Sequence, residues 1–317
     1  MKPTLTVIVP VYNGMPFLRE TIDSILNQTY QEFRFLIVDD GSTDNSSDYL
    51  KTLTDSRVEV RSQSNMGLCA SLNRAIESAD TELIARLDQD DVALSCRLEE
   101  QVNFLTAHPD YACVLSAVSR MTESGKAFGS YEVKATEAVS DYRANRYGCI
   151  AHSAICFRRE SFLALGGYRP VLYPVDDYDL LLRFEENYKV AVINRALIKY
   201  RIHSQAGTFK TFYDMDFKTR YVEAMAARRR SGKPEISLTE FNQILQQAPV
   251  WERWQKNADR VGRLMFRKAG LMIGEAQYIG GVYNLVGSFL LAPKFVWKRL
   301  LALYRSRSQS NSNLQNR

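Results

Sequence analysis

The feature that most constrains the fold is an alternation of short apolar runs with longer stretches of helical period. Apolar or β-branched runs occur at residues 4–9, 33–38, 57–61 and 81–87. Stretches whose apolar residues recur at the spacing of one helix face occur at residues 16–27, 46–53, 67–78 and 95–107. Strands that alternate with helices form right-handed βαβ crossovers, so the sequence predicts an α/β fold with a mainly parallel sheet flanked by helices.

The distribution of charge marks a boundary near residue 250. Residues 1–250 carry 29 Lys and Arg against 33 Asp and Glu, whereas residues 251–307 carry 11 against 3. With 317 residues and 45% hydrophobic content, the chain can bury a full core and still carry an extension. We expect the basic C-terminal arm to meet an anionic partner, either phospholipid or nucleic acid. The arm contains no recognisable nucleic-acid-binding module, which favours the lipid.

The cysteines and the N-terminus indicate a cytoplasmic protein. The five cysteines are odd in number and show no CxxC spacing, so we expect reduced, buried thiols. The first residues, MKPTLTVIVP, lack the apolar region and small-residue cleavage site of a secretory signal.

Polar clusters follow each of the four predicted strands. They are PVYN at 10–13, DDGSTD at 39–44, NMG at 65–67 and DQDD at 88–91. Any one of them could be an ordinary solvated turn, since Asp, Gly, Ser and Asn dominate turns. The carboxyl ends of parallel strands lie at one edge of a sheet, where ligands bind in such folds. Four clusters at that edge therefore predict a binding site.

The segment RLDQDDVAL places three carboxylates, Asp88, Asp90 and Asp91, within four positions. Such groups repel one another unless solvent or a cation compensates the charge. Carboxylate oxygens are hard ligands that suit Mg²⁺ or Mn²⁺ and leave room for phosphate and water. The sequence therefore predicts a divalent cation at this loop, with a merely solvated loop as the alternative.

Several segments together resemble one known family. VIVPVYN, LIVDDGSTD, NMGL and LDQDD are similar, in this order and spacing, to the nucleotide-sugar-binding half of the family 2 inverting glycosyltransferases of bacterial polysaccharide and lipopolysaccharide type. GCIAHSAICFRRESFLALGGYRP with VDDYDLLLRF, and YRIH, resemble the acceptor half. The resemblance covers about residues 5–203. It implies a GT-A (Rossmann-like) fold and a glycosyltransferase of hexosyltransferase type.

The resemblance also implies which residues bind the donor, most simply a UDP-sugar. They are Pro10, Tyr12, Asn13, Asp39, Asp40, Asn65, Gly67 and Asp88. Tyr12 would stack on the base and Asp40 would accept from a ring N–H, while Asp39 would support the loop. Asp88 would contact the ribose or the water shell of the metal. The metal ligands implied are Asp90, Asp91 and His203, with a structural role as the alternative for His203.

The acidic pair at the start of VDDYDLLLRF supplies the implied catalytic base. Asp176 and Asp177 precede a stretch of helical spacing, where helix capping by itself can explain an Asp. In the family the second member of the pair is the general base, which here is Asp177. It would take the proton from an acceptor hydroxyl during one in-line, inverting displacement. The first member is more often Glu in the family, so Asp176 remains the alternative base.

Two other classes of protein share part of this pattern. A sugar-phosphate nucleotidyltransferase would need a Gly-rich phosphate loop after the first strand, where PVYNGMPFLRE has only Gly14. A non-catalytic nucleotide-sugar-binding relative would not need Asp90, Asp91 and Asp177, all of which are present. We therefore predict metal-dependent transfer of a sugar to a saccharide or lipid-linked acceptor in cell-surface polysaccharide biosynthesis.

The predicted organisation has three parts. Residues 1–210 form the glycosyltransferase domain, with a nucleotide-sugar half (1–92) and an acceptor half (93–210). Residues 211–305 form a helical extension, and residues 306–317 form a disordered tail. No apolar run reaches the 18 or so residues needed to span a bilayer.

A helix beginning at Pro293 would place Lys294, Lys298 and Arg305 on one arc beside a mostly apolar one. This pattern predicts peripheral contact with the anionic inner face of the cytoplasmic membrane. The alternative is that this helix packs on the catalytic domain or on a partner chain.

Overall fold

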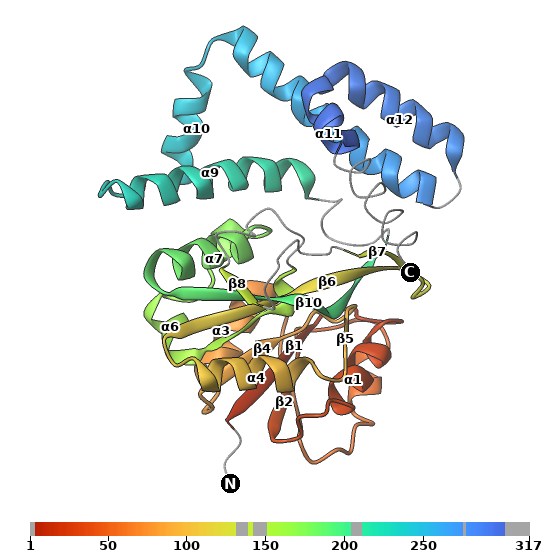
Figure 1. Cartoon of the computed structure of the whole chain (residues 1–317), viewed down its shortest axis with the longest axis vertical. Helices are drawn as coiled ribbons and strands as arrows, with labels where there is room; N and C mark the ends of the chain where they lie inside the picture. Colours follow the sequence, from red (N-terminus) through yellow and green to blue (C-terminus); the bar gives the residue numbers. More distant parts are fainter. Residues whose placement is uncertain (1–3, 131–138, 142–150, 204–210, 275–276, 302–317) are drawn as a thin grey trace, which may run out of the picture. The chain divides into compact units, whose positions relative to one another are not determined.

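The computed structural model describes residues 4–130, 139–141, 151–203, 211–274 and 277–301. The chain divides into two compact units, Met1–Lys210 and Thr211–Arg317 (Figure 1). The predicted tail, residues 306–317, lies outside the described residues, as does Arg305.

The first half of the N-terminal unit is a parallel sheet built from the predicted alternation. Its strands, in the order β3-β2-β1-β4, are β3 (Val58–Ser62), β2 (Phe33–Asp39), β1 (Leu5–Val11) and β4 (Leu83–Arg86). Every residue of β1 is buried because helices cover both faces of the sheet. The crossover helices are α1 (Leu18–Leu26), α2 (Ser46–Leu50) and α3 (Leu68–Ser78).

Beyond β4 the sheet becomes mixed. The order continues through β9 (Cys156–Arg158), β6 (Tyr111–Thr122), β10 (Lys189–Ile202) and β5 (Val92–Ala93). β9 runs antiparallel to β4 and β6, whereas β6 and β10 pair in parallel over most of their length. Two short strands lie off this path, β7 (Ala127–Ser130) against β6 and β8 (Val139–Asp141) against β10. The predicted α/β class, with a mainly parallel sheet, is confirmed.

Two apolar layers pack on the sheet. One contains α1, α2 and α4 (Arg97–Ala107), and the other contains α3, α6 (Arg159–Ala164) and α7 (Asp176–Asn187). Along β1, Val7 and Val9 enter the first layer and Ile8 enters the second, as the alternation of side chains along a strand requires. The buried sheet therefore holds the loops at its carboxyl edge in fixed positions.

The described residues of the C-terminal unit form helices joined by short loops, so the predicted helical extension is confirmed. Its helices are α9 (Phe212–Arg230), α10 (Leu238–Gln246), α11 (Val250–Gly274), α12 (Tyr278–Leu291) and a last helix over Pro293–Leu301. A capping box, in which Ser237 and Glu240 satisfy each other's backbone N–H groups, begins α10. The rings of Phe217 and Tyr221 pack on Phe241 and join α9 to α10.

Candidate functional site

The loops after β1 and β2 are tied to each other by short polar side chains. Asn13 adopts the left-handed region at φ 52°, and its Oδ1 accepts from the backbone N–H of Thr43 at 2.7 Å and of Asp44 at 3.2 Å. Asp39 is buried and accepts from the backbone N–H of Ser42 at 3.0 Å and from the hydroxyl of Ser47. Asn13 and Asp39 therefore organise these loops, which lie beyond the buried end of β1 at Pro10 and Val11.

Asp40 holds the loop between β3 and α3. Its carboxylate accepts from the side chain of Gln63 at 2.8 Å and from the backbone N–H groups of Met66 and Gly67, each at 2.9 Å. Burial alone would raise the pKa of Asp40, but these hydrogen bonds outweigh it and lower the pKa below its ordinary value. Gly67 has φ 86° at the start of α3, beside the exposed Asn65. The base-binding role of Asp40 stays a prediction.

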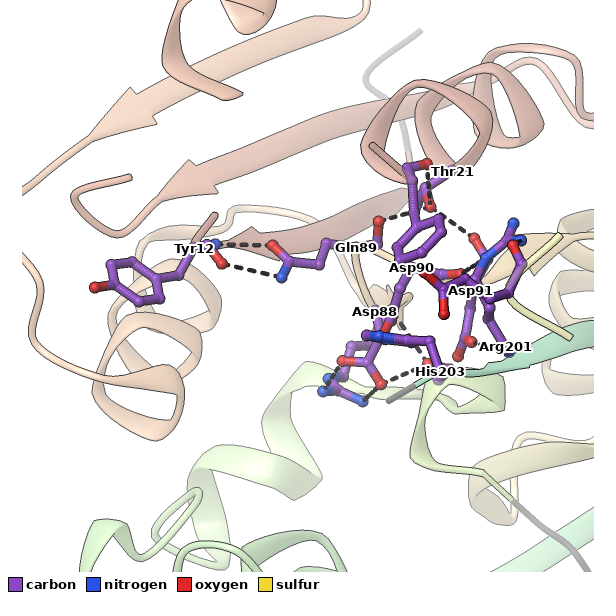
Figure 2. A network of polar contacts seen from close by, with 12 residues as sticks. Tyr12, Thr21, Asp88, Gln89, Asp90, Asp91, Arg201 and His203 are labelled. Carbon is purple, nitrogen blue, oxygen red and sulfur yellow. Dashed lines mark hydrogen bonds and ion pairs between the residues drawn. The ribbon is translucent and has the colours of Figure 1, made fainter. Parts of the chain in front are cut away.

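A glutamine that the sequence analysis did not single out joins the first loop to the acidic loop. Gln89 Oε1 accepts from the backbone N–H of Tyr12 at 2.8 Å, and Gln89 Nε2 donates to the Tyr12 carbonyl at 3.0 Å (Figure 2). A Cβ at Gly14 would lie 2.9 Å from Gln89 Oε1, so glycine leaves room for this contact. The ring of Tyr12 is 48% exposed, as a ring that stacks on a base must be.

Asp88 is held from two sides. The buried guanidinium of Arg86 forms a two-pronged ion pair with its carboxylate. Ser153 donates to Asp88 Oδ2 at 2.7 Å and accepts from the Asp88 backbone N–H at 3.1 Å. Neither Arg86 nor Ser153 was predicted as a site residue, although Ser153 lies inside a segment that resembles the family and Arg86 directly precedes another. Arg86 and Ser153 together hold the Asp88 carboxylate in place within the acidic loop.

Asp90 meets the end of β10. His203 Nε2 lies 2.9 Å from Asp90 Oδ2, and the imidazole packs on the ring of Phe17 with centroids 4.9 Å apart. Arg201 donates from Nε to the Asp90 carbonyl at 2.9 Å, and from its backbone N–H to Asp91 Oδ1 at 2.9 Å (Figure 2). The tertiary structure thus brings together Asp90 and His203, which are 113 positions apart in the sequence.

Asp91 faces the interior. It is fully buried, and its Oδ2 has no hydrogen-bond partner among the described residues. Burial, followed by the like charges of Asp90 and Asp88, raises the pKa of Asp91 well above its ordinary value. Of the three predicted metal ligands, the structure brings Asp90 and His203 into contact and buries Asp91 close to the charge of Asp90. The described part of the chain contains no group of three or more His, Cys, Asp or Glu side chains arranged to hold a metal ion.

The acidic pair begins α7, and the two carboxylates differ in exposure. Asp176 is buried and accepts from the thiol of Cys69, whereas Asp177 is partly exposed and accepts from the Tyr178 backbone N–H at 2.7 Å. Burial, and then the charge of Asp176, raise the pKa of Asp177 to about 7. Arg86 is close enough to lower this pKa, while Asp88 raises it further. Asp177 can therefore exchange a proton near neutral pH, within reach of the charges of the acidic loop.

Comparisons with known proteins agree on one family. The model of glycosyl transferase family 2 matches residues 6–166. The putative glycosyltransferase EpsE of Bacillus subtilis is 33% identical over 223 residues, which are 68% of this chain and 79% of the relative. The O-antigen biosynthesis glycosyltransferase WbnJ of Escherichia coli is 29% identical over 212 residues, 64% of this chain and 81% of the relative.

Among solved structures, residues 1–349 of TarS from S. aureus in complex with UDP-GlcNAc align with a TM-score of 0.57 at 16% identity. The alignment covers 92% of this chain and 91% of the TarS chain. The same fragment in complex with UDP aligns with a TM-score of 0.53. At this identity the likeness concerns the fold.

Proposed function

This chain belongs to glycosyl transferase family 2 and is a glycosyltransferase, and we propose that it transfers a sugar from a UDP-sugar, with inversion, to a hydroxyl of a saccharide or lipid-linked acceptor. The UDP complexes of TarS support the choice of donor, because TarS shares the fold that positions these loops. The similarity to WbnJ supports an acceptor in the biosynthesis of cell-surface polysaccharide. The exposed ring of Tyr12 and the loops organised by Asp39 and Asp40 are the surfaces that receive the nucleotide.

A divalent cation, Mg²⁺ or Mn²⁺, suits the acidic loop on chemical grounds. Asp90 offers a hard oxygen in contact with the imidazole of His203, and Asp88, which is paired with Arg86, belongs to the same carboxylate loop. We propose that Asp90 and His203 hold the ion and that diphosphate and water complete its coordination. When bound, such an ion neutralises charge that develops on the leaving diphosphate.

The observation that carries the mechanism is the position and pKa of Asp177. A base works best when its pKa lies near the operating pH, and burial beside Asp176 raises that of Asp177 to about 7. Asp177 accepts the proton of the acceptor hydroxyl as its oxygen attacks the anomeric carbon. The buried pair of Arg86 and Asp88 keeps the donor side of the site rigid during that step.

The test is the kinetics of Asp177→Asn. Losing a positioned general base costs roughly 10²- to 10⁴-fold in rate, so we expect kcat to fall by that order while UDP binding changes little. The matched variant is Asp176→Asn, which removes the neighbouring carboxylate and keeps the base. If Asp176→Asn is the crippling change and Asp177→Asn is not, the base is Asp176. Donor binding without any turnover in the wild-type protein would instead indicate a non-catalytic binding protein.

A further inference from the structure

Helix α12 carries its apolar side outward. Seven of its fourteen residues are large, apolar or aromatic, and at least 46% exposed. These outward residues are Tyr278, Ile279, Val282, Tyr283, Val286, Phe289 and Leu290. At about 100° per residue they fall within one arc of about 140°. A helix of a soluble protein normally turns such an arc toward the core, so among the residues that the structure describes this outer face of α12 lacks its usual partner.

The opposite side of α12, made of small and polar residues, packs on α11. A Cβ at Gly281 would lie 2.5 Å from Cγ1 of Ile273, and a Cβ at Gly287 would lie 2.2 Å from Cε of Met265. Ser288 is fully buried, and Asn284 donates to the Gly280 carbonyl at 2.9 Å. Glycines let the two helices approach closely, and the apolar side chains are left on the outside. The outward direction of the apolar face is therefore set by the packing of α11 against α12 (Figure 1).

The charged residues that follow this face in the sequence are all cationic. No Asp or Glu follows Glu275, whereas six Lys or Arg do. In the last described helix, over Pro293–Leu301, Lys294, Lys298 and Arg299 are exposed, and Trp297 is also exposed. Trp and Tyr at the border of an apolar surface, with Lys and Arg beside them, are typical of segments at a membrane interface. An apolar face surrounded by one sign of charge matches an anionic lipid surface better than it matches a second copy of this basic arm.

Helix α12 is too short to cross a lipid bilayer by itself. Fourteen helical residues measure about 21 Å, which is shorter than the roughly 30 Å hydrocarbon core. No single helix of the described residues has the length and apolar character to cross a bilayer. Tyr278–Leu291 and Pro293–Leu301 reach that composition only as a pair, bent by 118°. A helix that lies in the plane of the interface, followed by a sharp turn, accounts for both the length and the bend.

We propose that the outer face of α12 inserts into the interface of an anionic phospholipid bilayer, with Lys294, Lys298 and Arg299 near the headgroups. The proposal adds α12 to the helix beginning at Pro293, of whose predicted apolar arc Trp297, Leu300 and Leu301 are exposed. In that helix Val296 is fully buried, and Phe295 packs on Phe266 of α11 with ring centroids 5.5 Å apart. The insertion brings the site to a lipid surface, but it does not depend on the proposed reaction.

The experiment measures co-sedimentation of the full chain with vesicles. We expect binding to phosphatidylglycerol-containing vesicles to fall at least tenfold in the double variant Ile279→Glu with Leu290→Glu, which alters two outer-face residues that are 91% and 76% exposed. The matched control is Ile244→Glu with Val250→Glu, two apolar residues of the same unit that are 55% and 77% exposed. The control adds the same charge and should bind within about twofold of the wild type. Circular dichroism checks that both variants keep their helices.

A second arm tests the role of the cations. Lys294→Gln with Lys298→Gln should weaken binding to anionic vesicles several-fold and leave weak binding to neutral phosphatidylcholine vesicles unchanged. UDP-sugar hydrolysis, measured in parallel, reports on the proposed function independently. The proposal is overturned if both Glu double variants bind vesicles like the wild type, or if the wild type does not bind them. It is also overturned if the α12 variant only abolishes a dimer seen by light scattering, because a second copy would then cover the face.

Discussion

Asp176 and Asp177 share one helix start, but their environments differ. Asp176 is buried against Cys69, whereas Asp177 keeps partial access to solvent. Asp177 must be ionised to act as a base, so we expect kcat/KM to rise with pH through an apparent pKa near 7. The charge of Asp176 contributes to that raised pKa. In Asp176→Asn the acidic limb should therefore move to lower pH.

The measurement is the pH–rate profile of the two proteins with a saturating acceptor. Asp110→Asn is the control, because Asp110 is exposed and paired with Lys189. If the acidic limb of the pH–rate profile does not move in Asp176→Asn, the assignment of Asp177 as the titrating base is contradicted.

The proposed cation site at Asp90 and His203 predicts how mutations change the affinity for Mn²⁺. In the presence of UDP, His203→Ala should weaken Mn²⁺ binding at least about tenfold. Electron paramagnetic resonance of free Mn²⁺ measures this binding. Asp91→Asn should leave Mn²⁺ affinity nearly unchanged, because the Asp91 carboxylate faces the interior and an amide oxygen can still accept from the Arg201 N–H. Equal losses in both variants would place Asp91 back among the ligands.

His108→Ala is the control for the removal of an imidazole, since His108 packs against Phe104 at the end of α4. Its Mn²⁺ affinity should match that of the wild type.

At the scale of elements, the close contact between Gly262 of α11 and Ala292, which follows α12, can be tested by mutation. A Cβ at Gly262 would lie 2.7 Å from Cβ and 2.9 Å from the backbone N of Ala292. Alanine favours a helix over glycine by about 1 kcal/mol, but overpacking against a backbone atom costs about 1–3 kcal/mol. Gly262→Ala should therefore lower the stability of the C-terminal unit. Gly270→Ala, in the same helix with nothing within 4 Å of the added Cβ, should raise it.

Urea unfolding followed by circular dichroism measures both variants. If Gly262→Ala stabilises the unit as much as Gly270→Ala does, the close contact between α11 and residue 292 is absent in solution.

At the scale of the whole molecule, the division into two compact units predicts two unfolding transitions. Arg97 is fully buried in α4, and its guanidinium donates to the carbonyls of Arg86 at 2.6 Å and of Ile155 at 3.2 Å. Arg97→Ala should lower the stability of the N-terminal unit by about 3 kcal/mol or more, because it leaves a cavity and unpaired carbonyls.

Calorimetry with and without UDP identifies the N-terminal transition, since a ligand shifts only the unit that binds it. Arg97→Ala should move that transition, and Gly262→Ala should move the other. A single transition that both variants shift together would mean that the units unfold as one.

Local sequence patterns made the parallel half of the sheet, strands β1 to β4, predictable. Short apolar runs such as that at residues 4–9 can satisfy their backbone only in a buried sheet, and the turn residues that follow them mark its carboxyl edge. The later strands were harder to predict. β9 has three residues and runs antiparallel between β4 and β6, a pairing between distant segments that no local period specifies.

The sequence by itself determined the fold class, the family and the residue types of the site, because periodicity and short motifs are local properties of the chain. Only the tertiary structure decided that Asp90 contacts His203, that Asp91 is fully buried, and that Gln89 joins two loops. It also decided which side of α12 is exposed, since the glycines that pack on α11 point its apolar residues outward. These outcomes depend on which distant segments share a volume, and close packing selects one arrangement among several that the local sequence permits.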